Sequence, residues 1–243
     1  MRADGREPDQ IRPCTIERGF VKYAEGSALI KMGNTHVLCA ATVTDRLPRW
    51  LAGSDQGWIT AEYSLLPRAT IDRTPRESAG QVSGRTYEIQ RMIGRALRAV
   101  CDLHALGPWC IIVDCDVIQA DGGTRTAAIT GGYVAVAEAV SWMIQRNLIK
   151  TWPLIAQVAA ISAGLVQGQV LVDLTYEEDR MAAVDLNLVL TETGRIVEVQ
   201  AAAEGNPFTT EQLNALIQGA AKGIKELLKI QREALDGIVK RVG

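Results

Sequence analysis

Residues 116–133 constrain the fold more strongly than any other part of the chain. Before them, residues 110–117 alternate in polarity and are rich in β-branched side chains, which is typical of a buried strand. Residues 127–144 are apolar at helical spacing. Residues 121–126 are therefore predicted to be the turn where a strand leads into a helix.

This predicted turn has the properties of an anion-binding site. A helix start leaves backbone N–H groups unpaired and carries the positive end of the dipole, and Gly122 and Gly123 let the backbone approach a ligand closely. Arg125 adds a planar guanidinium suited to phosphate or carboxylate. An ordinary turn with a surface arginine explains the segment equally well. Because it matches neither the P-loop nor the dinucleotide-binding pattern, nucleotide binding of those kinds is unsupported.

Two carboxylates farther along the chain are candidates for a shared site. If residues 184–190 form a strand, their apolar side chains share one face, and Asp185 and Asn187 lie on the other. Asp179 is expected in the loop that enters this strand, so it could converge with Asp185. Paired carboxylates can hold Mg²⁺ near substrate phosphates, or one can stay protonated as a general acid. Two aspartates with no shared role are an equal alternative.

The charge of the chain is unevenly placed. The net charge of −2 argues against a uniformly basic nucleic-acid surface. Residues 46–98 contain nine arginines and five acids, whereas residues 173–211 contain nine acids and two arginines. This asymmetry suggests a site that grips phosphate on one side and a divalent cation on the other, although charge runs are more often solvated faces.

Arg85 differs from the other arginines of this basic stretch. Residues 83–86 are predicted to open a helix whose apolar positions follow the i, i+3, i+4 pattern. In the first turn, the guanidinium of Arg85 and the helix dipole would act on the same anion. The three later arginines of this helix fall on the opposite face, as expected of a surface helix. Before it, residues 68–80 are polar and without periodicity, which predicts a mobile loop.

The order of predicted elements indicates an α+β fold. It runs as meander, helix, strand, helix, meander, helix, and we interpret the chain as one domain, 1–243, with loosely similar halves at about 10–150 and 151–243. A capping box at Thr209 and Gln212 opens the last helix. The predicted strands cover residues 15–23, 27–32, 36–44, 58–63, 110–117, 154–163, 164–167, 170–175, 184–190 and 196–201.

Composition predicts a soluble cytoplasmic protein. No apolar run approaches the roughly 20 residues of a membrane helix, and the polar N-terminus lacks the apolar segment of a signal peptide. The five cysteines form no Cys-x-x-Cys pair and show no metal-ligand spacing. We therefore expect buried free thiols in a reducing compartment.

Several segments in register closely resemble the ribonuclease PH family over about residues 2–235. They are Gly-Trp-Ile-Thr-Ala-Glu-Tyr at 57–63, Gly-Arg-Thr at 84–86 with Glu-Ile-Gln-Arg at 88–91, the stretch 114–126, and Glu-Val-Gln at 198–200 with Ala-Glu-Gly at 203–205. The resemblance implies a phosphorolytic 3′–5′ exoribonuclease that trims transfer RNA precursors and other RNA 3′ ends. Inorganic phosphate is then the co-substrate, nucleoside diphosphates are released, and the reverse reaction adds nucleotides.

The resemblance also assigns roles to individual residues. It places the phosphate site on Arg85, Gly123, Thr124 and Arg125, the catalytic and Mg²⁺-binding carboxylates on Asp179 and Asp185, and the RNA-binding arginines on Arg68, Arg73 and Arg76. One departure is Ala201-Ala202, where Gly-Thr is expected, which leaves every assigned ligand in place.

The implied fold is that of ribonuclease PH, related to a domain of ribosomal protein S5, with two mixed sheets, packed helices and assembly as a homohexameric trimer of dimers. An alternative is a catalytically silent, RNA-binding subunit of an exosome-like ring. A silent relative can lose the arginines or a carboxylate, whereas Arg85, Arg125, Asp179 and Asp185 are all present, which favours an active enzyme. A hydrolytic nuclease is disfavoured because water as the nucleophile needs no anion loop.

Overall fold

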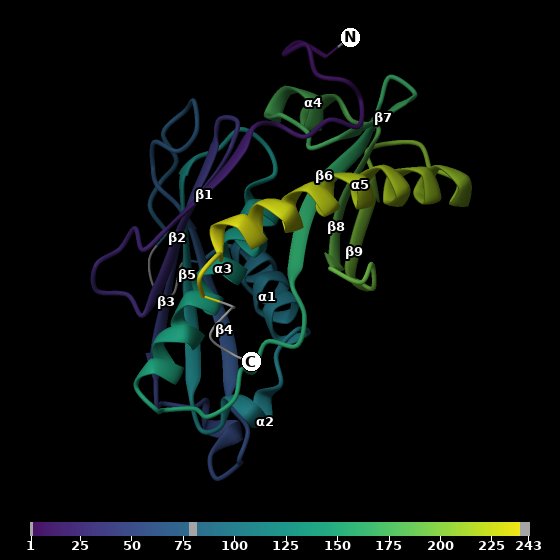
Figure 1. Ribbon diagram of the computed structural model, residues 1–243. Helices are drawn as coiled ribbons and strands as arrows, with labels where there is room; N and C mark the ends of the chain where they lie inside the picture. The colour runs from purple at the N-terminus through teal and green to yellow at the C-terminus, as the bar shows by residue number, and fades with distance from the viewer. Residues whose placement is uncertain (1, 78–81, 239–243) are drawn as a thin grey trace.

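A five-stranded sheet forms the first half of the protein. The computed structural model describes residues 2–77 and 82–238. The strands of the first sheet are β1 (Cys14–Arg18), β2 (Gly26–Met32), β3 (Thr35–Thr44), β4 (Trp58–Leu65) and β5 (Cys110–Gln119), in the spatial order β1-β2-β3-β5-β4. Strand β4 pairs parallel to β5, and the other pairs are antiparallel (Figure 1). A short 3₁₀ helix, η1 (Arg49–Leu51), lies between β3 and β4.

A four-stranded antiparallel sheet forms the second half. Its strands are β6 (Val158–Val166), β7 (Gln169–Val172), β8 (Val184–Thr191) and β9 (Ile196–Ala203), in the order β7-β6-β8-β9. Every second residue of β8 from Val184 to Leu190 is buried and apolar, as predicted from its alternation. Asp185 and Asn187 therefore lie on the opposite face of this sheet.

Within residues 2–77 and 82–238, five α-helices complete the α+β architecture. They are α1 (Gly84–Arg98), α2 (Leu103–Leu106), α3 (Thr124–Gln145), α4 (Tyr176–Met181) and α5 (Thr210–Ala234). Helix α3 packs against β2 and β3 of the first sheet and β6 of the second, so it joins the two sheets (Figure 1). Helix α1 covers β4, and α5 covers β6 and β7. The α+β expectation is confirmed. The expectation of two mixed sheets was wrong for the second sheet, because all of its strand pairs are antiparallel and only the first sheet contains a parallel pair.

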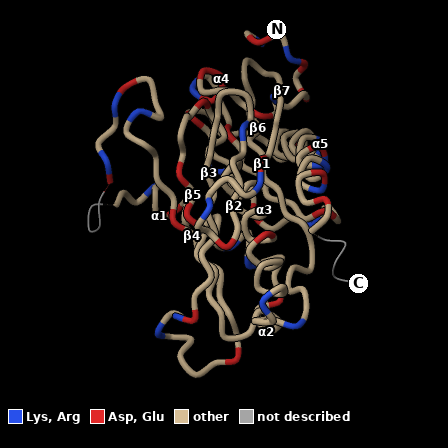
Figure 2. The backbone as a smooth tube through the Cα atoms, turned by 60° about the vertical axis from the view of Figure 1, so that its left-hand side comes forward, with Lys and Arg blue, Asp and Glu red and all other residues tan. Residues whose placement is uncertain are grey.

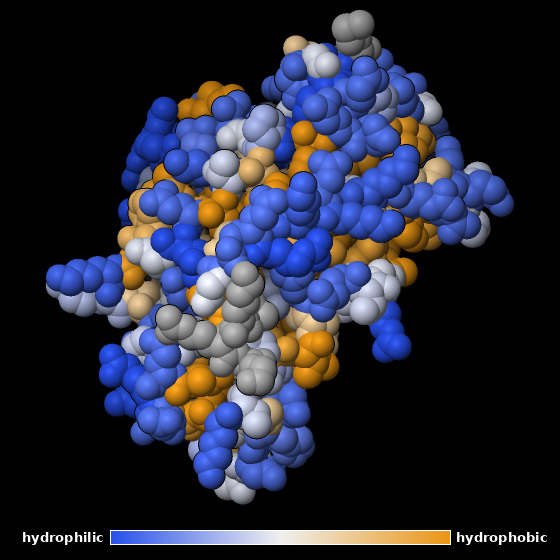
Figure 3. Space-filling model, viewed as in Figure 1, coloured by the Kyte–Doolittle hydropathy of each residue, from blue (hydrophilic) through white to orange (hydrophobic). Residues whose placement is uncertain are grey.

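Helix α3 corrects the expectation that no apolar run approaches membrane-spanning length. By length and composition its 22 residues could cross a membrane, with a mean hydropathy of 1.4 over an 18-residue window. In the fold, 78% of that window is buried inside the protein. Its apolar character on all sides follows from its place between two sheets. The face drawn in Figure 3, which includes α5, is mainly hydrophilic.

Several predicted boundaries were wrong. Strand β1 ends at Arg18 rather than at residue 23, because Gly19 adopts φ of +66° and begins a turn. Residues 158–166 form one strand, so the two predicted strands 154–163 and 164–167 are a single element that starts later. The predicted capping box at Thr209 and Gln212 is present. All five cysteines are free and four of them are buried, as expected.

Candidate active site

One cleft of about 400 Å³ gathers the predicted phosphate-binding and carboxylate residues. It lies where the N-terminal ends of α1 and α3 meet α4 and β8. Its lining includes Arg85, Gly123, Thr124, Arg125, Asp179 and Asp185. A neighbouring cavity of about 410 Å³ carries the acids Glu62, Asp114 and Asp116 and none of these residues. The cationic and anionic candidates, far apart in sequence, thus share one space.

The glycine turn before α3 is shaped by contact with the second half of the chain. Gly122 and Gly123 adopt φ of +74° and +66°, the left-handed region that favours glycine. A Cβ atom on Gly122 would lie 2.3 Å from the carbonyl oxygen of Leu174, so residue 122 must be glycine for this approach. Gly123 is the N-cap of α3 and no side chain caps the helix. The first N–H groups of α3 thus keep their capacity for an anion.

Thr124 is held by a buried tyrosine. The hydroxyl of Tyr63 on β4 lies 2.8 Å from Oγ1 of Thr124, the first residue of α3. Burial raises the pKa of Tyr63, so the phenol stays neutral and can donate this hydrogen bond. Tyr63 belongs to a segment that supported the family resemblance, but its contact with Thr124 requires β4 to lie beside the start of α3.

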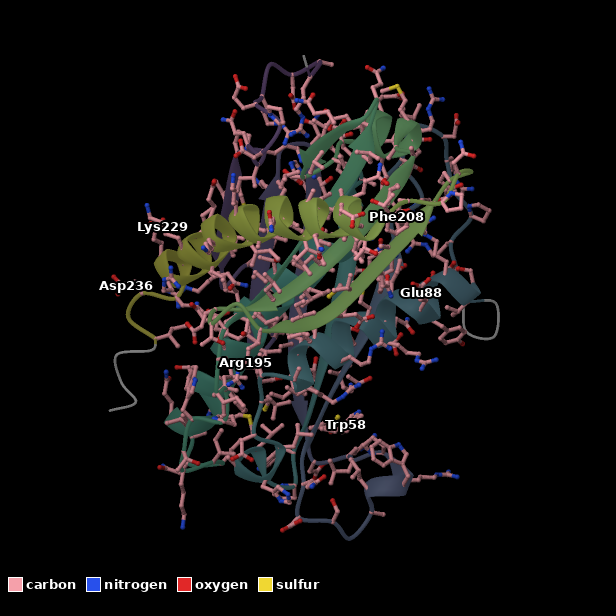
Figure 4. All side chains as sticks on the ribbon, turned by 90° about the vertical axis from the view of Figure 1, so that its right-hand side faces the viewer. Trp58, Glu88, Arg195, Phe208, Lys229 and Asp236 are labelled. Carbon is pink, nitrogen blue, oxygen red and sulfur yellow. The ribbon has the colours of Figure 1, made fainter. Side chains whose placement is uncertain are left out.

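The two arginines of the cleft differ in how they are held. Arg85 is exposed in the first turn of α1, a helix capped by the side chain of Ser83. Arg125 is partly buried, and its Nη1 atom donates to the side-chain oxygen of Gln200 on β9 at 3.4 Å. The same nitrogen is 3.8 Å from Glu88 of α1, which Figure 4 shows close to the second sheet. Both guanidinium groups are thus available to an anion in the cleft.

The charge of Asp185 acts on Asp179 across the cleft. Partial burial raises the pKa of Asp179 and the charge of Asp185 raises it further, while Arg125 and Arg85 oppose this shift. Burial is also the main cause that raises the pKa of Asp185. Asp179 still reaches solvent, which weakens these charge effects. It lies on the short helix α4, not in the expected loop, because Thr175 and Glu178 form a capping box that the sequence prediction missed.

This carboxylate pair is suited to Mg²⁺ rather than to a metal that needs a complete protein cage. Among the residues that the structure describes, no three His, Cys, Asp or Glu side chains are grouped to hold a metal ion. Mg²⁺ commonly binds one or two carboxylates and takes its other ligands from water and substrate phosphates. A cation between Asp179 and Asp185 would also offset the charge of Asp185, which raises the pKa of Asp179.

The three predicted RNA-binding arginines belong to a segment that partly lines the cleft. Arg68, Arg73 and Arg76 are exposed on the segment between β4 and α1, which projects from the body of the protein in Figure 2. Thr70 and Thr74 of the same segment line the cleft. Part of the predicted loop, residues 78–80, falls outside the described residues.

A buried arginine near the N-terminus supports the anion turn and was not predicted. Arg12 donates to both carboxylate oxygens of Asp173, at 2.9 and 2.6 Å, and both side chains are almost fully buried. Its Nη1 and Nη2 atoms also donate to the carbonyl oxygens of Asp121 and Gly122, at 2.5 and 3.4 Å. Arg12 therefore ties the turn before α3 to the segment before α4.

A second buried arginine supports the helix that carries Asp179. Arg2 donates to both carboxylate oxygens of Glu178 at 2.8 and 2.7 Å, and Arg6 lies 3.7 Å from the same carboxylate. Burial alone would raise the pKa of Glu178, but the hydrogen bond from Arg2 opposes burial, and the net pKa is lowered. No local pattern in residues 2–12 signals these contacts, since their partners lie more than 160 residues away. Only the high arginine content of this segment hints at them.

Comparison with known families matches both halves of the chain. A family model described as the 3′ exoribonuclease family, domain 1, matches residues 10–141. A second model, the 3′ exoribonuclease family, domain 2, matches residues 156–223. Together the two models cover most of the chain.

Individual relatives agree with this assignment. The chain is 53% identical to ribonuclease PH of Moorella thermoacetica, over 100% of this chain and 98% of that protein. The crystal structure of rice (Oryza sativa) Rrp46 superposes with a TM-score of 0.78 at 22% identity, covering 97% of this chain and 100% of that one. An Archaeoglobus fulgidus exosome with RNA bound to the active site also gives a TM-score of 0.78 at 22% identity, over 94% and 91% of the two chains. These solved structures establish a shared fold.

Proposed function

The chain belongs to the 3′ exoribonuclease family, and we infer from this that it is a phosphate-dependent 3′–5′ exoribonuclease. The observation that carries this function is the shared cleft, where an anion-binding turn with two arginines faces a pair of carboxylates. A phosphorolytic enzyme must hold one anion beside another. The cleft offers fixed N–H, hydroxyl and guanidinium donors for that purpose.

Inorganic phosphate is the nucleophile in the proposed reaction. The phosphate is held by the N–H groups at the start of α3, by the hydroxyl of Thr124 and by the guanidinium groups of Arg125 and Arg85. One of its oxygens forms a bond to the phosphorus of the last phosphodiester, and the bond to the 3′ oxygen of the preceding nucleotide breaks. A nucleoside diphosphate leaves, and the shortened RNA keeps a 3′ hydroxyl after its oxygen takes up a proton. In reverse, a nucleoside diphosphate extends the RNA.

Asp179 and Asp185 have two proposed tasks. They are the residues that would hold Mg²⁺, which when bound stabilises negative charge on the transferring phosphoryl group. The alternative task is general acid catalysis: burial raises the pKa of each carboxyl group, so one that does not bind the metal ion is suited to keep a proton for the leaving 3′ oxygen. The neutral phenol of Tyr63 keeps the Thr124 hydroxyl in place.

We propose transfer RNA precursors as the substrates and a homohexameric trimer of dimers as the assembly, in the cytoplasm. The name of the Moorella relative supports a ribonuclease, and the exosome structures support a fold that is used in multimeric RNA-binding assemblies. Arg68, Arg73 and Arg76 are exposed on a segment that partly lines the cleft, and we propose that they bind the RNA backbone as it enters.

The test of this function is release of nucleotides from a 3′-extended transfer RNA with Mg²⁺, in the presence and absence of inorganic phosphate. Nucleoside diphosphates that appear only with phosphate are expected. Nucleoside monophosphates would instead identify a hydrolase. RNA binding without nucleotide release would favour the alternative, a silent subunit of an exosome-like ring, whose fold is that of the solved exosome structures.

A further inference from the structure

A chain of side-chain hydrogen bonds lies behind Arg125, outside the set of residues assigned to phosphate. Arg125 on α3 donates to the side-chain oxygen of Gln200 on β9 at 3.4 Å. The side-chain nitrogen of Gln200 donates to Glu198 at 3.1 Å. Arg95 on α1 donates to both oxygens of Glu198, at 3.0 and 2.5 Å. Three elements, α3, β9 and α1, are thus linked through one glutamine.

The chemistry of its neighbours determines how the Gln200 amide is oriented. A guanidinium only donates hydrogen bonds, and a carboxylate only accepts them. The amide oxygen of Gln200 must therefore face Arg125, and its NH₂ group must face Glu198. With the amide reversed, two donors would face each other at one end and two acceptors at the other.

This arrangement keeps the charge of Arg125 available. The carboxylate of Glu198 is already neutralised by Arg95, and the hydrogen bond between them raises the pKa of Arg95. Glu198 reaches Arg125 only through the neutral amide. Among the described residues, Arg125 forms an ion pair with Glu88 at 3.8 Å, and solvent screens this pair because the Glu88 side chain is half-exposed.

Resting on the function proposed above, we propose that Gln200 is a positioning residue for phosphate binding. It orients the guanidinium of Arg125 toward the anion turn with a neutral acceptor that does not compete with phosphate for the positive charge. The Arg95–Glu198 pair in turn holds Gln200. Register supports this role, because Gln200 is the cross-strand partner of Asn187, which lines the cleft on the same face as Asp185.

The decisive variant is Gln200→Glu, which keeps the size of the side chain but places a carboxylate against Arg125. We expect the KM for inorganic phosphate to rise about tenfold or more, because the new ion pair competes with phosphate, while kcat and RNA affinity change little. Gln200→Met, which removes the acceptor but adds no charge, is expected to raise this KM only about two- to fivefold. A purely structural role predicts the reverse order, with the apolar variant more damaging.

A swapped variant controls for charge and composition. Glu198→Gln combined with Gln200→Glu keeps one glutamine and one glutamate on β9 but moves the carboxylate next to Arg125. We expect its phosphate KM to rise as in Gln200→Glu. Thermal unfolding of each variant shows whether it folds. A swapped or Gln200→Glu variant that folds and keeps the wild-type phosphate KM would overturn the proposal.

Direct calorimetric titration of inorganic phosphate into the RNA-free protein separates this proposal from the function on which it rests. Weaker phosphate binding by Gln200→Glu, with normal binding by the wild type, supports the proposal independently of turnover. If the wild-type protein releases nucleotides without phosphate and does not bind phosphate, both the function and the proposal are rejected. If the wild-type protein depends on phosphate and the Gln200 variants bind phosphate as tightly as it does, only the positioning role is rejected.

Discussion

At the scale of single residues, Arg125 has the clearest expected effect. Its guanidinium lines the cleft, and its ion pair with the half-exposed Glu88, at 3.8 Å, is screened by solvent. We expect Arg125→Ala to raise the KM for phosphate by about 10- to 100-fold, the effect of losing a charge-assisted hydrogen bond, and to leave RNA binding largely intact. Steady-state rates over a range of phosphate concentrations measure this.

The matched control is Arg91→Ala, since Arg91 is exposed on α1 and does not line the cleft. The control should keep the wild-type phosphate KM. If Arg125→Ala behaves like Arg91→Ala, the turn before α3 has no part in phosphate use.

At Asp185, the effect of the negative charge can be tested without changing the shape of the side chain. Asp185→Asn keeps the side-chain volume but removes one of the two carboxylates of the cleft. We expect turnover to be lost, with a decrease of at least about 100-fold in kcat, while folding and assembly are retained. Asp45→Asn, at an exposed position outside the cleft, is the control. Substantial activity in Asp185→Asn would refute the role assigned to this carboxylate.

At the scale of elements, the turn before α3 depends on the segment that leads into α4. We expect Gly122→Ala to lower the free energy of unfolding more than Gly168→Ala does. Both glycines have positive φ, but a Cβ atom at residue 122 would meet the Leu174 carbonyl, whereas at residue 168 it would meet no described residue within 4 Å.

The left-handed backbone costs an alanine about 1–2 kcal/mol at either position. Any further loss in Gly122→Ala measures the close contact between the two halves of the site. Urea unfolding of both variants provides the comparison. Equal losses would show that backbone conformation alone explains the glycine at residue 122.

The loop between β4 and α1 supplies the RNA-binding charges in the proposed mechanism. Replacing Arg68, Arg73 and Arg76 by alanine should weaken RNA binding and lower the slope of log affinity against log salt by about 2, since each single-strand phosphate contact contributes about 0.7. Fluorescence titrations at several salt concentrations measure this slope. The control replaces three exposed lysines of α5, Lys222, Lys225 and Lys229, by alanine, which removes the same number of positive charges. This control should leave the salt slope unaltered. An unchanged slope in the arginine variant would remove the loop from the RNA path.

At the scale of the whole molecule, assembly as a hexamer has a direct test. Sedimentation of the wild-type protein should give a mass of about six times the 26.3 kDa of one chain. The variants Arg125→Ala and Asp185→Asn should sediment in the same way, because their side chains lie in the cleft. A monomer that is active in phosphorolysis would show that the ring is not needed for the reaction.

Short-range features of this protein follow from its sequence. The strand–turn–helix unit around residues 116–133, the cap at Thr209 and the shared apolar face of β8 were predicted correctly, because each depends on neighbours within a few residues. The boundary at Gly19 was missed, since alternation alone continues through a turn that glycine makes possible. The family resemblance added roles for single residues that periodicity does not provide.

Only the tertiary structure decided how the cleft is built. Arg12 and Asp173 are 161 residues apart, and Arg125 and Gln200 are 75 apart, so neither pair leaves a local pattern in the sequence. Their meeting depends on α3 joining the two sheets and on burial that makes each charged group require a partner. The sequence by itself determined which chemical groups the site contains. The packing of the two halves determined which of those groups are free for substrate and which are used to hold the others.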